Sequence, residues 1–223
     1  LNVAYNGKMV FKGLNWTFQN GEHWHISGPN GSGKSTLLSM ISGDNPKAYG
    51  KDITLFGIKR GSGESIWDIK RHFGILSSSL HRDYRVSVTL LEAVVSGFYD
   101  SIGLYDKPTP SQWRIGKEWI ELLGMKVQEQ KPFSALSFGE QRRVLIVRAV
   151  VKLPLILLLD EPCLGLDNKN RSLVLALIDY IAAHSQTHIL FVSHDYRDEL
   201  SCLNRSLEFV VEKECYRAKI STL

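Results

Sequence analysis

The stretch GPNGSGKST, residues 28–36, decides the fold of this 223-residue chain. It fits the pattern G-x-x-x-x-G-K-[ST], in which glycines let successive backbone N–H groups curl around phosphate oxygens. The segment before it, EHWHISG, alternates like a strand, and the segment after it, KSTLLSMISG, has the periodicity of a helix. A strand, a glycine-rich loop and a helix in that order predict a phosphate-binding loop (P-loop) rather than an ordinary Gly/Ser turn.

The residues of this loop are the first candidate ligand contacts. We expect nucleotide binding by Gly28, Pro29, Asn30, Gly31, Ser32, Gly33, Lys34, Ser35 and Thr36. Lys34 has the position from which an ammonium reaches β- and γ-phosphates, and the Ser35 hydroxyl is a candidate Mg²⁺ ligand. The positive N-terminal end of the following helix adds to the attraction for phosphate.

A second signal is LILLLDEP, residues 155–162, where a continuous apolar run ends in two carboxylates. Such a run is typical of a strand buried on both faces. Asp160 at its tip is well placed to hold Mg²⁺ through water. Glu161 is a candidate base that orients and deprotonates a water attacking the γ-phosphate. The alternative, a strand that merely ends in an acidic turn, is weaker beside a P-loop.

The stretch ALSFGEQRR, residues 135–143, allows two interpretations. Ser137 and Glu140 form a capping box, S-x-x-E, which by itself only starts a helix. The same helix N-terminus, with a serine hydroxyl and Gly139 permitting close approach, also describes a second phosphate-binding surface. Both can hold at once, and the residues alone do not decide between them.

Alternation of strand and helix patterns along the chain predicts a parallel α/β sheet. Strands are expected at residues 22–28, 52–57, 73–76, 153–160 and 187–195, and an edge hairpin at 205–220. Helices are expected at residues 34–43, 89–98, 111–124, 137–152 and 168–184.

Taken together, the motifs resemble those of ABC-type ATPases. GPNGSGKST, LSFGEQRR, LLLDEP, LGLD (164–167) and VSHD (192–195) occur in that family's order over essentially the whole chain. The resemblance implies a P-loop NTPase of ABC type with a parallel-sheet core, an N-terminal antiparallel β lobe and a helical signature lobe. It also implies one ATP-binding domain over residues 1–223, with core and β lobe at 1–76 and 153–223 and the helical lobe at about 77–152.

The same resemblance implies ATP and Mg²⁺ as cofactors, and a role for further residues. Tyr5 matches the aromatic that stacks on adenine, although it also fits a core strand. Ser137 and Gly139, with Glu140 beside them, match the signature that contacts a nucleotide held by a partner domain. Asp167 matches the loop that communicates across the dimer. His194 matches the switch histidine that contacts the γ-phosphate, although a lone histidine after a strand is more often a plain loop residue.

One departure from the family pattern lies in FGILSSSLHRDY, residues 73–84. ABC transporter domains usually have glutamine after this strand, in a loop that touches Mg²⁺ and the membrane subunit. Ser78 stands there instead. Its shorter side chain is a candidate metal contact only with a shifted loop or a bridging water. The alternative is that the serines cap the segment that follows. Serine at this position leaves the prediction of an ATPase unchanged. It weakens the prediction that the domain couples to a membrane subunit.

For partners and location, the family resemblance implies a second ABC ATPase domain, supplied in cis or by a homodimer. Segments such as SSSLHRDYRVS and SGFYDSIGLY are similar to one half of tandem ABC ATPases of the molybdenum-transport and photorepair-like type. We therefore expect a molybdate-transport ATPase that engages a membrane permease, or alternatively a soluble tandem protein acting on nucleic acid or a macromolecular complex. Either would work in the cytoplasm, free or at the inner face of the cell membrane.

Composition sets limits on these alternatives. A net charge of +4 is too weak to imply nucleic acid without a clustered patch, and HRDYR (81–85) is the one local hint. The longest apolar runs are too short to span a bilayer. Cys163, Cys202 and Cys215 have no ligand-like spacing, which favours reduced thiols.

Overall fold

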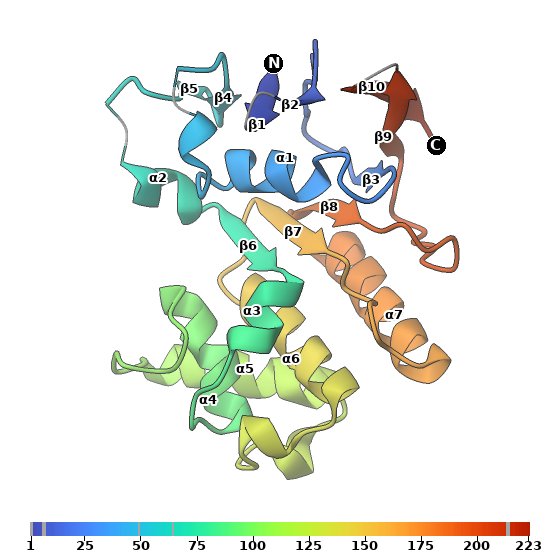
Figure 1. Ribbon diagram of the computed structural model, residues 1–223. Helices are drawn as coiled ribbons and strands as arrows, with labels where there is room; N and C mark the ends of the chain where they lie inside the picture. Colours follow the sequence, from blue (N-terminus) through green and yellow to red (C-terminus); the bar gives the residue numbers. More distant parts are fainter. Residues whose placement is uncertain (1, 6–7, 49, 64, 213–214) are drawn as a thin grey trace.

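A computed structural model describes residues 2–5, 8–48, 50–63, 65–212 and 215–223. Its centre is an eight-stranded sheet crossed by helices (Figure 1). Across the sheet the strands are β1 (Val3–Tyr5), β2 (Lys8–Phe11), β10 (Cys215–Thr222), β9 (Arg205–Glu212), β3 (Trp24–Ser27), β8 (His188–Val192), β7 (Ile156–Asp160) and β6 (Phe73–Leu76). The helices are α1 (Lys34–Ile41), α2 (Ile66–Lys70), α3 (Ser78–Asp83), α4 (Leu90–Val95), α5 (Pro110–Leu122), α6 (Phe138–Val150) and α7 (Asn168–His184).

The central strands are parallel and are buried on both faces, as their apolar runs predict. Successive side chains of a strand point to opposite faces. Leu157 and Leu159 accordingly join the hydrophobic cluster on the side of α4 to α7, whereas Ile156 and Leu158 join the cluster on the side of α1. The sheet therefore separates two hydrophobic cores.

The register of the parallel strands brings their carboxyl ends to one edge of the sheet. Val192 of β8 pairs with Ile26 of β3 on one side and with Asp160 of β7 on the other. Leu76, the last residue of β6, pairs with Leu159. In open α/β sheets ligands bind outside this edge. The loops that carry the predicted catalytic motifs all start there.

The N-terminal strands extend the same sheet as an antiparallel lobe, in agreement with the predicted fold. β1 pairs antiparallel with β2, and β9 pairs antiparallel with β10 over its whole length. β2 meets β10 in parallel, and β9 meets β3 in parallel. The C-terminal hairpin β9–β10 thus lies between the N-terminal strands and the core.

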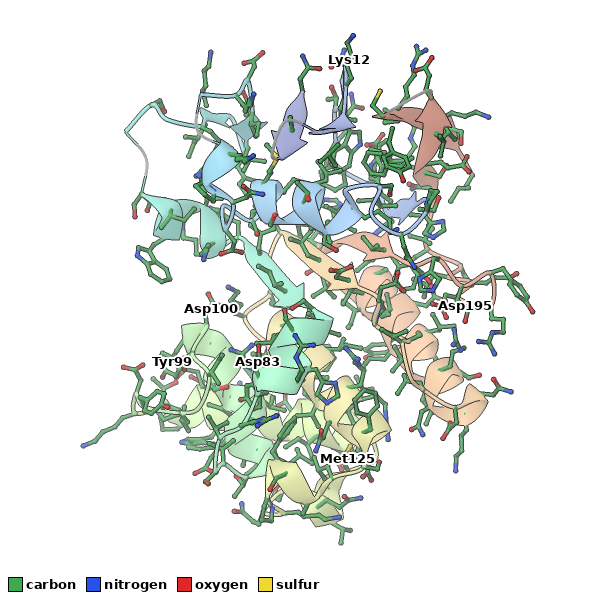
Figure 2. All side chains as sticks on the ribbon, viewed as in Figure 1. Lys12, Asp83, Tyr99, Asp100, Met125 and Asp195 are labelled. Carbon is green, nitrogen blue, oxygen red and sulfur yellow. The ribbon has the colours of Figure 1, made fainter. Side chains whose placement is uncertain are left out.

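Helices α3 to α6 gather below the sheet in Figure 1, with α6 packing against both α4 and α7. Asp83, Tyr99 and Met125 lie in this helical region, whereas Lys12 lies at the opposite end of the molecule, beside the N-terminal strands (Figure 2). Short 3-10 turns complete the connections at Pro46–Ala48, Ser96–Tyr99, Lys126–Gln128 and Phe133–Ala135.

Two sequence-based expectations were wrong. Residues 52–57 do not form a strand of the main sheet, because the chain reverses at Phe56 and Gly57, where φ is 53° and 79°. They begin a separate two-stranded hairpin, β4 (Thr54–Leu55) and β5 (Ile58–Lys59). The alternative that the serines after β6 cap the following segment is confirmed at Ser77, which caps helix α3. β7 also begins three residues later than predicted, after a left-handed turn at Leu153.

No helix among the described residues is both long and apolar enough to cross a membrane. Cys163, Cys202 and Cys215 are all free thiols, as expected.

Candidate functional site

The P-loop joins β3 to α1 with a backbone that requires glycine. Gly28 has φ 137°, and a Cβ at this position would lie 2.8 Å from both the carbonyl oxygen and the Cβ of Phe209 in β9. Gly33 precedes α1 in the left-handed region, and no side chain caps the first turn of that helix. The first N–H groups of a helix have no partner within the helix, so those of α1 are available to an anion.

Three hydrogen bonds fix the side chains of Lys34 and Ser35 in this loop. Lys34 donates from Nζ to the carbonyl oxygens of Gly28 (2.7 Å) and Pro29 (3.0 Å). Ser35 donates from Oγ to Oδ2 of Asp160 at 3.0 Å. The structure therefore brings the predicted metal ligands Ser35 and Asp160 together from positions 125 residues apart.

Burial shifts the pKa values of Lys34 and Asp160 in opposite directions, in each case disfavouring the charged form. Burial lowers the pKa of Lys34, against the attraction of the carboxylates of Glu161 and Asp160. Burial raises the pKa of Asp160, against the Ser35 hydrogen bond and the charge of Lys34. Perturbed titrating groups in a cleft are typical of functional sites.

The two predicted catalytic residues are in direct contact. His194 Nδ1 and Glu161 Oε1 lie 2.7 Å apart. Glu161 has φ 52°, in the left-handed region that side chains rarely adopt, and its N–H donates to the carbonyl oxygen of Val192. Such backbone strain clusters at active sites. The unusual turn after β7 thus points Glu161 toward the loop that follows β8.

These groups surround a cleft of about 650 Å³. It is lined by Val10, Asn30, Gly31, Gly33, Lys34, Ser35, Thr36, Asp160, Glu161, Leu164 and His194. Sequence reasoning missed Val10 and Leu164. Val10 comes from β2, and no local signal connects a short N-terminal strand to the P-loop. Leu164 belongs to the recognised LGLD stretch, so its place beside Glu161 could have been anticipated.

The signature residues lie at the N-terminus of α6, outside this cleft, and Ser137 and Glu140 hydrogen-bond to each other there. Ser137 caps α6, accepting from the N–H of Glu140 (3.3 Å), while its own N–H donates to that carboxylate at 2.8 Å. Burial alone would raise the pKa of Glu140, but hydrogen bonds from Ser137 and Gln128 outweigh it and lower the pKa. The capping interpretation of this stretch is thereby confirmed, and the ligand interpretation stays a prediction.

Gly139 and Asp167 both lie against the same residue, Asn170. A Cβ on Gly139 would lie 2.3 Å from the side chain of Asn170, so glycine is needed for α6 to approach α7 this closely. Asp167 caps α7 and accepts from the backbone N–H (2.7 Å) and side-chain amide (3.0 Å) of the same Asn170. These bonds lower the pKa of Asp167. None of the signature residues, nor Asp167, is among the described residues that line the cleft.

The segment after β6 packs against the signature helix. Ser77 caps α3 by accepting from the N–H of Leu80 at 3.1 Å. His81 stacks on Phe138, with ring centroids 4.4 Å apart, and its Nε2 lies 3.0 Å from Oε1 of Gln141. The predictions for the side chains of Tyr5 and Ser78 lie outside the part of the chain whose side chains are described.

The stretch HRDYR does not form an exposed basic-aromatic surface. His81 and Tyr84 are buried, and Tyr84 contributes its hydroxyl to a contact with Ser96 at 3.2 Å. Two exposed arginines, Arg82 and Arg85, are too few to form a patch. The local hint of nucleic-acid binding therefore loses its aromatic component.

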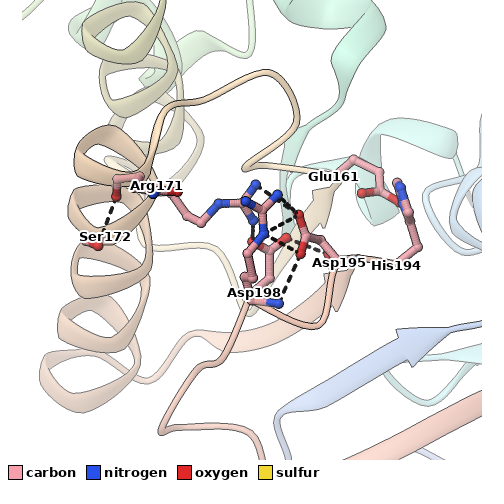
Figure 3. Close-up of polar contacts among 9 residues, drawn as sticks. Glu161, Arg171, Ser172, His194, Asp195 and Asp198 are labelled. Carbon is pink, nitrogen blue, oxygen red and sulfur yellow. Dashed lines mark hydrogen bonds and ion pairs between the residues drawn. The ribbon is translucent and has the colours of Figure 1, made fainter.

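A charged cluster that sequence reasoning missed flanks His194 (Figure 3). Arg171 of α7 contacts Asp195, with Nη2 and Oδ2 3.0 Å apart, and also contacts Asp198. Arg197 binds Asp195 from the solvent side at 2.6 Å. Hydrogen bonds from Arg197, together with the charges of both arginines, hold the pKa of Asp195 well below its usual range. No motif links residue 171 to residues 195–198 in the sequence.

Comparison with known proteins identifies the family. A family model described as ABC transporter matches residues 11–164. The chain belongs to this family. This ABC cassette is 49% identical over 216 residues to the ABC transporter ATP-binding protein ModF of Escherichia coli K12, covering 96% of the chain and 44% of ModF. The chain thus spans less than half the length of that relative.

Solved ABC cassettes confirm the fold. CbiO1 of Clostridium perfringens, described as part of the transporter complex cbiONQ, matches with a TM-score of 0.78 and 24% identity over 98% of the chain and 84% of CbiO1. The dimeric cassette MJ0796, described as bacterial, matches with a TM-score of 0.76 and 20% identity over 100% and 95% of the two chains. The family match and the likeness to ModF confirm the ABC ATPase domain predicted from the motifs.

Proposed function

We propose that the P-loop cleft of this ABC cassette binds and hydrolyses Mg²⁺-ATP. The observation that carries the proposal is the 2.7 Å contact between Glu161 and His194 in the same cleft as Lys34 and Ser35. A carboxylate and an imidazole placed beside a phosphate-binding loop are suited to activating a water. Little covalent chemistry is required of the protein in phosphoryl transfer, so positioning and charge stabilisation suffice.

The residues present fit a magnesium ion. Ser35 and Asp160 supply a hydroxyl and a carboxylate, the oxygen donors that Mg²⁺ prefers, and their oxygens lie 3.0 Å apart. Mg²⁺ bound there neutralises charge on the β- and γ-phosphates. Ser78 remains a proposed further contact, through water.

In the proposed mechanism, Lys34 exchanges its backbone acceptors for phosphate oxygens, and the N–H groups of the loop from Gly28 to Thr36 surround the phosphates. Glu161 accepts a proton from the attacking water, and His194 fixes the carboxylate through its Nδ1 contact. Because His194 contacts Oε1 of Glu161, the proposal assigns the proton to Oε2. Tyr5 is proposed to stack on adenine.

The decisive experiment replaces the base. Glu161→Gln keeps the shape of the side chain and removes its ability to take a proton, so steady-state turnover should fall at least about 100-fold. ATP affinity should be retained, because Lys34 and Ser35 are untouched. A Gln variant that hydrolyses ATP at the wild-type rate would rule out the assigned base.

We propose further that the cassette works in a head-to-tail dimer, as half of a tandem protein or as a homodimer. Ser137 and Asp167 are exposed in the single chain, and they lie outside the P-loop cleft. The proposed role of Ser137, Gly139 and Glu140 is to meet a nucleotide held by the second cassette, with Asp167 beside them. The dimeric state described for MJ0796 supports this arrangement. The whole chain would then act as a single cassette with its helices at about 77–152 as the signature lobe.

For the cellular role, we propose that the cassette supplies energy for molybdate transport from the cytoplasmic side of the membrane, through a permease. The likeness to ModF and to CbiO1, a component of a transporter complex, supports this proposal. The test is an ATPase assay of the whole protein with its candidate permease in vesicles. Stimulation by molybdate is expected, and a rate that ignores molybdate would argue against transport.

A second candidate is a soluble tandem ATPase that acts on nucleic acid or a macromolecular complex. It is favoured by the serine at position 78 and by the packing of α3 onto α6 through His81 and Phe138, which occupies the segment expected to receive a membrane subunit. ATPase stimulation by DNA or RNA, in the same assay and without vesicles, would support this candidate over transport.

A further inference from the structure

Helix α7 and the two loops that carry the candidate catalytic groups Glu161 and His194 come together at one buried carboxylate. Asp198 accepts from the hydroxyl of Ser193 at 2.5 Å and from the guanidinium of Arg171. Cys163, two residues after Glu161, is buried near the same carboxylate, and burial together with the charge of Asp198 raises the pKa of this thiol to about 12. Asp198 therefore bonds the loop after β8 to helix α7 and lies near the loop after β7.

Both residues that flank His194 depend on this cluster. Ser193 is bonded to Asp198, and its oxygen accepts the backbone N–H of Asp195 at 3.1 Å. Asp195 binds the second nitrogen of Arg171 at 3.0 Å. One planar guanidinium thus holds two carboxylates, one on the residue next to His194 and one four residues beyond it, which fixes the loop between them (Figure 3).

We propose that Arg171 is a positioning residue for ATP hydrolysis, because it sets the place of His194 against Glu161. The inference rests on the proposed function. Arg171 also donates its backbone N–H to the carbonyl oxygen of Asp167, in the first turn of α7. Its side chain therefore connects the end of α7 proposed to face the partner cassette with the loop that bears His194.

The first test measures ATPase rates of Arg171→Ala in the whole protein, with Glu161→Gln as the background rate. Displacing His194 by about an ångström should lower kcat about 10- to 100-fold. The KM for ATP should change by less than about twofold, because the P-loop contacts do not involve Arg171. Arg197→Ala is the matched control, since Arg197 binds the same Asp195 from an exposed position, and its effect should stay below about threefold.

A double substitution separates positioning from general stability. If Arg171 acts through His194, adding Arg171→Ala to His194→Ala should lower kcat no further, because residues that act as a unit are not additive. Arg171→Lys should recover part of the rate, since lysine restores the charge without the two-carboxylate fork.

Arg171→Ala leaves Asp198 buried without its counter-ion and can destabilise the fold. The variant Arg171→Met with Asp198→Asn removes both charges together, and it should keep a thermal midpoint near that of wild type while losing the same rate. Wild-type kcat in that folded variant, or rate losses that multiply with His194→Ala, would overturn the role of Arg171 while the proposed function stands. Unchanged turnover in both Glu161→Gln and His194→Ala would instead overturn the proposed function, and the role of Arg171 with it.

Discussion

The P-loop cleft and the signature region carry equally specific sequence motifs, yet their polar groups are used differently. In the cleft, backbone N–H groups at the start of α1 have no side-chain cap, and Lys34 is bound only to carbonyl oxygens of its own loop. In the signature region, Ser137 and Glu140 satisfy each other, and Asn170 takes up both the space beside Gly139 and the oxygens of Asp167.

The difference shows that a motif can build its own site or only part of one. The cleft gathers groups from the ends of β3, β7 and β8 within one chain. The signature region offers a capped, rigid helix end whose exposed serine has bonds only to its neighbours. It is suited to contact with another molecule, and four tests measure how far the two regions differ.

The largest effect is expected in the cleft, for Lys34→Ala. Hydrogen bonds to charged groups contribute about 1.5 to 3 kcal/mol, so the Kd for ATP should rise about 10- to 100-fold. Fluorescence titration with a nucleotide analogue measures it. Lys59→Ala is the control, because that ammonium is exposed and pairs only loosely with Asp52 at 3.6 Å. An unchanged Kd in the Lys34 variant would show that the cleft is no more available to ATP than the signature region is.

In the signature region the next largest effect is on stability. Gly139→Ala places a methyl group 2.3 Å from the side chain of Asn170. Overpacking of this kind should lower the free energy of unfolding by about 1 to 3 kcal/mol in urea denaturation. Asn170→Ala removes the clashing atoms beyond Cβ, so the double variant should recover part of that loss. If Gly139→Ala lowers the free energy of unfolding equally with and without Asn170→Ala, the contact between Gly139 and Asn170 does not hold α6 against α7.

Ser137→Ala tests whether the signature serine is more than a cap. Its matched control is Thr109→Ala, since Thr109 caps α5 with the same reciprocal geometry, accepting from the N–H of Gln112 at 3.3 Å. Each variant should lose about 1 kcal/mol of stability. Only Ser137→Ala should also lower the ATPase rate. If both variants keep the wild-type rate, Ser137 serves the helix alone.

The smallest expected effect is on the pH dependence of folding stability. Its sign differs between His81, which packs on the signature helix, and Asp160 in the cleft. Burial lowers the pKa of His81, so the unfolded chain takes up a proton near pH 6.5 before the folded chain does, and stability falls below that pH. Burial raises the pKa of Asp160, so the folded chain binds that proton first and this group favours folding as pH falls toward 4. His81→Gln should flatten the stability curve between about pH 7 and 5.5, and Asp160→Asn should steepen its acid limb. Thermal unfolding from about pH 7 to about pH 4 measures both slopes.

The sequence predicts the core of the fold and the cleft well, because both depend on local patterns. Apolar runs at 156–160 and 188–192 identify buried strands, and parallel strands necessarily bring their carboxyl ends, with Asp160 and His194, to one edge. The capping box at Ser137 is equally local. These features follow from spacing along the chain, without knowledge of tertiary contacts.

What escaped prediction depends on residues that are distant in sequence. Helix α3 was missed because serines favour loops as readily as helix caps, and its packing relies on His81 meeting Phe138. The hairpin at Thr54–Lys59 was mistaken for a core strand because short apolar stretches do not reveal a positive φ at Phe56. The charged cluster around Asp198 has no periodicity at all, since it joins a helix to a loop 27 residues away.

The position of the C-terminal hairpin has a consequence for how the protein is made. β10 is the strand that pairs with β2, so β1 and β2 have no place in the main sheet until β10 has been synthesised. Gly28 likewise packs against Phe209, so the nucleotide loop gains its support only at that late stage. Contacts of such long sequence separation slow folding. The helices of the nascent cassette can form early, but its nucleotide loop is supported only after β9 has been synthesised.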